Sequence, residues 1–162
     1  MDSGPAIAVI ELLSIARGMT TLDKMIKKAP VRPLHAGVIS PGKYLIVVHG
    51  DVASVEEAYL EALSHGGRRV GDHLFLPQAH EGLLPAMTGS VEAESIDSFG
   101  VVEALGAAAT IHGADVCAKA VDVDILEIRF AKHLGGKGYF TMSGAQESVE
   151  AALDAASALL SE

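Results

Sequence analysis

The sequence has little sulfur, few aromatic rings and few basic side chains. Its 162 residues contain one cysteine, no tryptophan, and 12 basic against 21 acidic side chains, which gives a net charge of −9. A single cysteine, Cys117, excludes an intrachain disulfide and a cysteine-rich zinc site. The acidic balance argues against a nucleic-acid partner, because nucleic-acid binding needs basic patches. We therefore expect a cytosolic protein with no nucleic-acid partner.

Long hydrophobic runs are also missing. The longest stretch without a charged residue covers residues 104–114, which is 11 residues, whereas a membrane-spanning helix needs about 20. The N-terminus carries Asp2 in place of a basic region, and Glu11 interrupts the apolar run that follows. These features predict neither a membrane span nor a signal peptide.

The sequence is rich in apolar residues, and its charged residues are distributed unevenly between the two halves of the chain. Apolar residues make up 49% of the chain, which is enough for a packed core. Residues 1–89 carry 9 acids and 8 bases, whereas residues 90–162 carry 12 acids and 4 bases. A short polar stretch separates the two parts. We predict a first domain over residues 1–89, a linker over 90–95 and a second, shortened domain over 96–162.

The two halves of the chain repeat each other. A shift of 92 residues gives 8 identities in 32 positions, including Glu11 with Glu103 and Lys27 with Lys119. After a two-residue insertion, a shift of 94 gives 8 more in 22 positions, including Gly42-Lys43 with Gly136-Lys137. These identities indicate an internal duplication.

Hydrophobic periodicity predicts the same element order, βαββα, in both copies. The first copy has predicted strands at 6–11, 34–39 and 44–49, helices at 14–29 and from Ser54, and a tail with a strand at 73–76 and a short helix near 80–87. In the second copy the strands are at 100–103, 126–131 and 139–143, and the helices at 107–121 and 148–160. We predict an α+β, ferredoxin-like fold with helices on one face of each sheet.

Three segments resemble a known family. AIAVIELLSIARGMTTLDKMIKKAPV, SPGKYLIVVHGDVASVEEA and HLFLPQAHEGLLPA are similar to bacterial microcompartment shell proteins, and two such domains in unpermuted order resemble the tandem-domain class. The resemblance implies a non-enzymatic, structural tile in a shell in the bacterial cytoplasm. It also implies homotrimers that mimic hexamers, contacts with other hexameric and pentameric shell proteins and with encapsulated enzymes, and a central pore that passes small polar metabolites.

The resemblance also implies which residues line that pore: Ser40, Pro41, Gly42, Leu134, Gly135 and Gly136. Taken alone, these residues are more typical of an ordinary hairpin turn, and it is the resemblance that favours the pore. In the propanediol-utilisation type of this class, a cysteine at the position of Ser40 holds an iron–sulfur cluster. Such clusters are held by cysteine thiolates, so Ser40 predicts a protein without this cofactor.

Three further residues resemble the edge motifs by which tiles of this family join, namely Lys27, Lys119 and His80. A solvated helical lysine is the alternative for the first two. Their recurrence at equivalent positions of both copies favours the edge role. At Gln78 the family often has arginine, so one hydrogen-bonding group expected at this edge is missing.

No catalytic or metal-binding constellation stands out. The seven histidines are scattered, without the spacing of a metal-binding helix. Glu11 and Glu103 each follow a strand and precede a helix, so we expect the helix N-terminus to satisfy each carboxylate. The alternative to a shell tile is a cytosolic α+β oligomer that binds or senses a small molecule; an enzyme with a site between subunits ranks third.

Overall fold

The computed structural model describes residues 5–93, 96–130 and 134–161. The chain divides into two compact units, Met1–Ala79 and His80–Glu162, called here the first and second unit. No helix among the described residues is long and apolar enough to cross a membrane.

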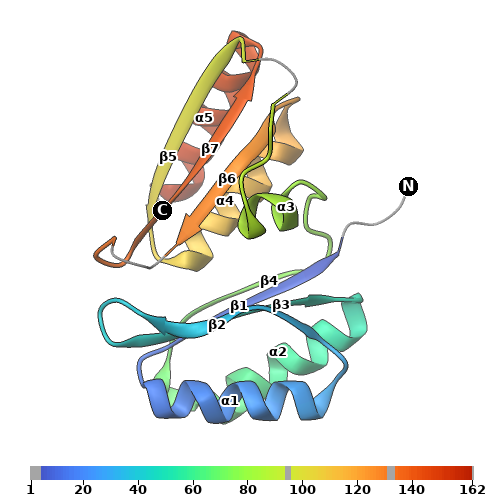
Figure 1. The fold of residues 1–162 in the computed structure, drawn as a ribbon, viewed down its shortest axis with the longest axis vertical. Coiled ribbons are helices and arrows are strands. Elements are labelled where there is room, and N and C mark those ends of the chain that lie inside the picture. Colours follow the sequence, from blue (N-terminus) through green and yellow to red (C-terminus); the bar gives the residue numbers. More distant parts are fainter. Residues whose placement is uncertain (1–4, 94–95, 131–133, 162) are drawn as a thin grey trace. The chain divides into compact units, whose positions relative to one another are not determined.

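The first unit is a four-stranded antiparallel sheet covered on one face by two helices (Figure 1). The strand order is β2-β3-β1-β4, so β1 lies between β3 and β4. The elements are β1 (Ala6–Leu12), α1 (Ile15–Lys28), β2 (Arg32–Ile39), β3 (Lys43–Gly50), α2 (Val52–Gly66), a 3-10 turn η1 (Gly67–Arg69) and β4 (Val70–Leu76).

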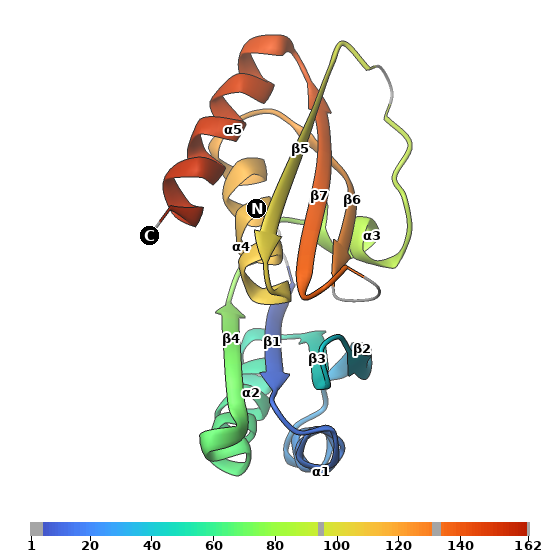
Figure 2. The ribbon, with the colours of Figure 1, turned by 90° about the vertical axis from the view of Figure 1, so that its left-hand side faces the viewer.

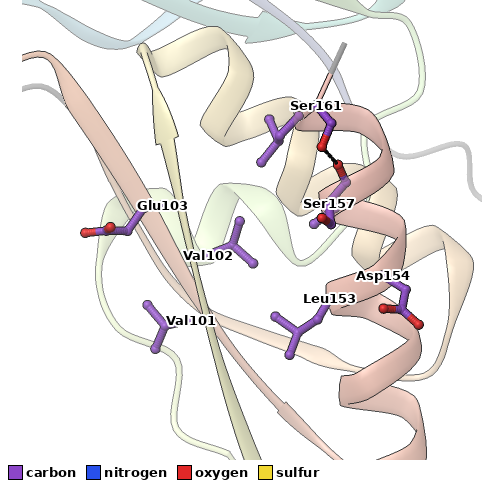
Figure 3. Close-up of a pocket in the computed structure, with 9 residues that line it drawn as sticks. Val101, Val102, Glu103, Leu153, Asp154, Ser157 and Ser161 are labelled. Atoms are coloured by element: carbon purple, nitrogen blue, oxygen red, sulfur yellow. Dashed lines mark hydrogen bonds between the residues drawn. The ribbon is translucent and has the colours of Figure 1, made fainter.

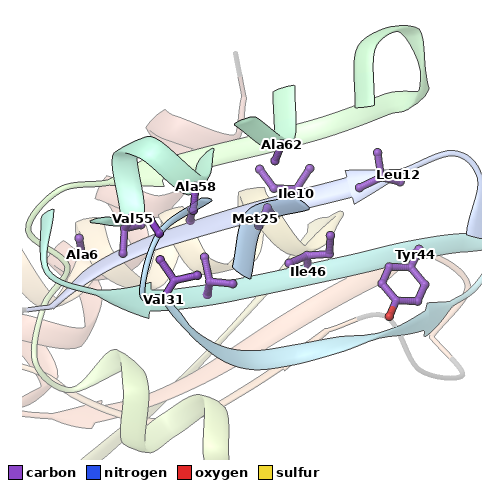
Figure 4. Packing of buried hydrophobic residues seen from close by; sticks show 13 residues of the cluster. Ala6, Ile10, Leu12, Met25, Val31, Tyr44, Ile46, Val55, Ala58 and Ala62 are labelled. Carbon is purple, nitrogen blue, oxygen red and sulfur yellow. The ribbon is translucent and has the colours of Figure 1, made fainter. Parts of the chain in front are cut away.

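The core of this unit lies between the sheet and its helices. Alternate residues of β1 and β3 meet small residues of α2 and Met25 of α1 (Figure 4). The buried cluster consists of Ala6, Ala8, Ile10, Leu12, Met25, Ala29, Val31, Tyr44, Ile46, Val48, Val55, Ala58 and Ala62. Small residues on α2 allow close approach to the sheet, which is how a sequence with few aromatics fills its core.

Both helices of the first unit begin at a side-chain cap. Ser14 accepts a hydrogen bond from the Arg17 backbone N–H at 3.3 Å and caps α1. Asp51 caps α2 by accepting from the Ser54 N–H at 3.0 Å, so α2 begins at Val52, before the start that we placed at Ser54. An aspartate is among the strongest N-caps, and these hydrogen bonds from Ser54 lower the pKa of Asp51.

The second unit repeats this plan with one strand fewer in its described part. Its elements are α3 (Leu83–Thr88), β5 (Ser98–Leu105), α4 (Ala107–Ala120), β6 (Asp124–Phe130), β7 (Lys137–Gly144) and α5 (Gln146–Leu160). The sheet order is β5-β7-β6, and α4 and α5 cover one face (Figure 2). The α+β class and the repeated βαββα order predicted from the sequence are confirmed.

The helix of the tail that we assigned to the first domain packs in the second unit, whereas the strand of the tail stays in the first unit as β4. Residues 80–89 belong to the second unit, where α3 contacts β6 and α4. Further along, the Val91 N–H donates to the Leu126 carbonyl of β6 at 2.7 Å. The apolar residues Leu83, Ala86 and Met87 of α3 are buried. The apolar spacing of so short a helix shows that one face is buried, but it does not show which unit the helix packs against.

In each unit a helix, α1 or α4, comes very close to the hairpin, with the glycine of the contact on the helix in one unit and on the strand in the other. A Cβ added to Gly18 of α1 would lie 2.3 Å from the Cβ of Tyr44 on β3. At the equivalent place in the second unit the helix carries Thr110 and the strand carries Gly138, whose added Cβ would lie 2.3 Å from the Thr110 Oγ1. The large partner is therefore on the strand in one copy and on the helix in the other.

Candidate pore turns and tile edge

The predicted pore residues form two hairpin turns. Ser40, Pro41 and Gly42 connect β2 to β3, with a cis Ser40-Pro41 bond and φ of 65° at Gly42. Leu134, Gly135 and Gly136 precede β7, and the two glycines have φ of 61° and 89°. Positive φ favours glycine, so the glycines serve the turn geometry itself, as in any hairpin, and leave small, exposed backbone at each tip.

A lysine follows each turn and pairs with the glutamate at the end of the unit's first strand. Lys43 Nζ lies 3.1 Å from Glu11 Oε2, and Glu11 is only 2% exposed. Lys137 Nζ lies 3.9 Å from Glu103 Oε2, but there both side chains are more than half exposed. Our expectation that helix N-termini satisfy these carboxylates missed the lysines. The two ion pairs place a carboxylate beside each lysine that follows a turn.

Because Glu11 is buried and Glu103 is exposed, we predict different effects for the same substitution at the two lysines. Replacing Lys43 by methionine is expected to lower the free energy of unfolding by about 1–3 kcal/mol, because a buried carboxylate loses its charged partner. Lys137→Met is expected to change it by less than about 0.5 kcal/mol, because exposed pairs contribute little. Urea unfolding followed by circular dichroism measures both, and equal effects of the two variants would contradict this assignment.

The predicted edge lysines occupy equivalent places late in α1 and α4. Lys27 Nζ lies 2.7 Å from Asp23 Oδ2, with the lysine side chain 70% exposed. Lys119 Nζ lies 2.5 Å from Asp115 Oδ2, and Asp115 is almost fully buried. In each pair the aspartate lies four residues, or about one helical turn, before the lysine. This is a favourable spacing for opposite charges on a helix.

The third predicted edge residue shares a partner with Lys119. The His80 backbone N–H donates to Asp115 Oδ1 at 2.7 Å, and the His80 Nδ1 accepts from the Gly82 N–H at 3.2 Å. Asp115 thus fixes both His80 and Lys119, a role that we did not predict. The signal was available, because the aspartate recurs four residues before the lysine in both copies.

The residues of the turns do not fit an iron–sulfur cluster. Ser40 offers a hydroxyl in place of a thiolate, and Cys117 lies in α4, fully buried, with its thiol donating to the Ala152 carbonyl at 3.2 Å. Among the described residues there is no group of three or more His, Cys, Asp or Glu side chains that could hold a metal ion.

Burial makes Cys117 unreactive in the folded chain. Desolvation raises the pKa of its thiol from 9.0 to about 11, so at pH 8 the folded protein holds almost no thiolate, which is the nucleophilic form. We expect labelling with a thiol reagent at pH 8 to be slow for the native protein and fast in urea. Fast native labelling at pH 8 would contradict this burial.

The comparison with protein families decides the identity. The BMC domain model matches residues 6–79 and again residues 98–162. The chain belongs to the BMC domain family. Over 152 residues it is also 38% identical to the bacterial microcompartment shell protein PduT of Citrobacter freundii, covering 94% of this chain and 83% of that protein. The chain is thus a non-enzymatic, tandem BMC shell protein of a bacterial microcompartment.

Solved structures support the same assignment. A microcompartment protein from Desulfitobacterium hafniense superimposes with a TM-score of 0.90 at 35% identity, covering 98% of this chain and 88% of that one. A double-ringed trimeric shell protein of the RMM microcompartment has a TM-score of 0.70 at 16% identity, covering 98% and 83%, and shows the shared fold. Microcompartment shell proteins with this fold thus include one that forms trimers.

Proposed function

We propose that three copies of this chain form a ring of six BMC domains and that the ring is a facet tile of the shell. The observation that carries the proposal is the tandem repeat, because each copy has the same element order and the BMC model matches both. Three chains give six similar domains around a closed three-fold axis. Such a tile fits beside hexameric and pentameric shell proteins, and its inner face can meet encapsulated enzymes.

In this ring the turns at Ser40–Gly42 and Leu134–Gly136 surround a central opening. Their glycines leave backbone exposed at each turn, and backbone N–H groups there and the Ser40 hydroxyl are potential hydrogen-bond donors to a passing solute. Because Lys43 and Lys137 are paired with Glu11 and Glu103, the opening favours small polar metabolites with no strong preference for anions. The transport is passive.

Lys27, Lys119 and His80 form the edge by which neighbouring tiles join. Lys27 and Lys119 are partly exposed and lie in the last turn of their helices. The Asp115 contacts of Lys119 and His80 hold these two residues in a defined position before assembly. Pre-ordered edge groups reduce the entropy lost on association.

Multi-angle light scattering tests the ring. One chain has a mass of 16.8 kDa, so a trimer is expected at about 50 kDa. Two-dimensional class averages from electron microscopy are expected to show a flat particle with three-fold symmetry and a central opening. A monomer, or a compact dimer, would overturn the proposed tile.

A further inference from the structure

A surface hollow of about 370 Å³ lies in the first unit, where α1 begins and where η1 follows α2. Its lining residues are Ser14, Ala16, Arg17, Thr20 and Arg69. The Leu13 N–H donates to the Arg69 carbonyl oxygen at 2.7 Å, and this hydrogen bond ties η1 to the chain just before α1. Residues from two distant parts of the sequence therefore meet at this hollow.

The charged residues that line the hollow are both arginines. Arg17 and Arg69 are exposed, and no carboxylate among the described residues forms an ion pair with either of them. Two like charges at one hollow repel each other, and a hollow with charge of one sign attracts ions of the opposite sign. The charge of this hollow therefore favours an anion.

The position of Arg17 in its helix favours an anion as well. Arg17 stands three residues after the N-cap Ser14, in a first turn that contains no acidic residue. The N-terminal end of a helix carries partial positive charge, so an arginine there is unfavourable unless an anion lies nearby. An anion in the hollow would be stabilised by the two arginines and, in addition, by the end of α1.

Contacts with α2 hold the Arg17 side chain before any ligand arrives. The Arg17 Nη1 lies 3.4 Å from His65 Nε2, and the Thr20 Oγ1 lies 3.1 Å from the same ring nitrogen. Because arginine has no acceptor, the guanidinium is the donor in its contact with His65. A side chain that is already held loses less conformational entropy when it binds a ligand. Arg17 is therefore partly pre-organised for binding.

The second copy does not repeat this arrangement. The shift of 92 residues places Ala109 at the position of Arg17. The second unit has instead a groove of about 480 Å³ between β5 and α5 (Figure 3), and the charged residues that line this groove are Glu103 and Asp154. The positive hollow is thus a property of the first unit and does not follow from the fold that the two units share.

We propose that the hollow binds the phosphoryl group of a small solute through Arg17 and Arg69. The planar guanidinium donates two parallel N–H bonds to phosphate oxygens, and two arginine charges match a phosphate dianion. The Ser14 hydroxyl, which accepts from the Arg17 N–H, still has its own proton to donate. The volume of the hollow is within the range of small-ligand pockets, about 300–1,000 Å³. All these residues belong to the first unit, so the inference does not depend on the ring.

Isothermal titration calorimetry of the full chain at pH 8 and low ionic strength tests the inference. Inorganic phosphate is expected to bind saturably, with one ion per chain, and acetate to bind at least about tenfold more weakly because it carries a single charge. Glycerol 3-phosphate identifies the source of the phosphoryl group. Tighter binding than that of inorganic phosphate indicates a phosphate ester, and weaker binding indicates the free ion. The absence of saturable phosphate binding, or equal binding of acetate, would overturn the proposal.

Matched variants locate the binding. Arg17→Gln and Arg69→Gln are each expected to weaken phosphate binding by about tenfold or more, because each removes a charged hydrogen-bond donor. Arg32→Gln is the control, since Arg32 is exposed on β2 of the same unit and does not line the hollow. It is expected to leave phosphate binding unchanged. Circular dichroism checks that each variant is folded, and equal phosphate binding by all three folded variants would overturn the assignment to this hollow.

Discussion

Replacing both Lys27 and Lys119 by alanine is expected to abolish extended sheets while the trimer persists. Within one chain each lysine makes an ion pair one helical turn away, and such pairs contribute little when exposed. Between tiles the same contact repeats along every edge, so its loss is multiplied by avidity. Negative-stain microscopy of the purified protein, or of its mixture with a hexameric shell protein, measures the loss.

The two lysines differ in what their removal leaves behind. Asp115 is nearly buried, so Lys119→Ala is also expected to destabilise the second unit by about 1–3 kcal/mol. Lys27→Ala carries no such penalty, because Asp23 is half exposed. The single variant Lys27→Ala thus separates assembly from stability, with Lys24→Ala on the same helix as its control. Normal sheets from the double variant would contradict the edge assignment.

Ser40→Cys is expected to give the protein the ability to bind an iron–sulfur cluster that the natural sequence lacks. Around a three-fold axis the substitution places three thiols at one opening, and thiolates are the ligands that such clusters require. After anaerobic reconstitution the variant is expected to hold about one cluster per trimer, whereas the natural protein stays colourless. Iron and sulfide analysis with visible absorbance measures this difference.

A cysteine placed away from the turn provides the control for this experiment. Ser64 is exposed on α2, so Ser64→Cys adds the same number of thiols per trimer without bringing them to the proposed opening. It is expected to remain colourless. Stoichiometric iron in the natural protein would show that Ser40 does not mark the cluster position, and equal iron in both variants would show that the turns do not converge.

The repeat carried most of the information that the sequence held about this fold. Element types follow from local periodicity, and a pattern seen twice is less ambiguous than one seen once. The start of α2 was missed because Ser54 and Glu57 also fit the pattern of a capping box, whereas the structure uses Asp51, three residues earlier, as the N-cap. When two nearby residues can both cap a helix, the sequence alone does not decide which of them does so.

What the sequence could not reveal depends on contacts between distant residues. The residues of the Glu11 and Lys43 pair are 32 positions apart, and those of the His80 and Asp115 bond 35 apart. Only the fold brings such residues together. Identical glutamate and lysine residues in both copies also differ in burial, since Glu11 is enclosed and Glu103 is not. The same residue at equivalent positions of the two copies therefore does not have the same solvent exposure.

The contact between helix and hairpin has its glycine on the helix in the first unit and on the strand in the second. This difference affects recombination between the two halves of the gene. A crossover that moved α4 into the first half would set Thr110 against Tyr44, where even one added carbon has no room. The reciprocal product would set Gly18 against Gly138 and leave a hole. Both recombinants are expected to be less stable than the parent, so the reversed contact is a physical barrier to exchange between the two halves.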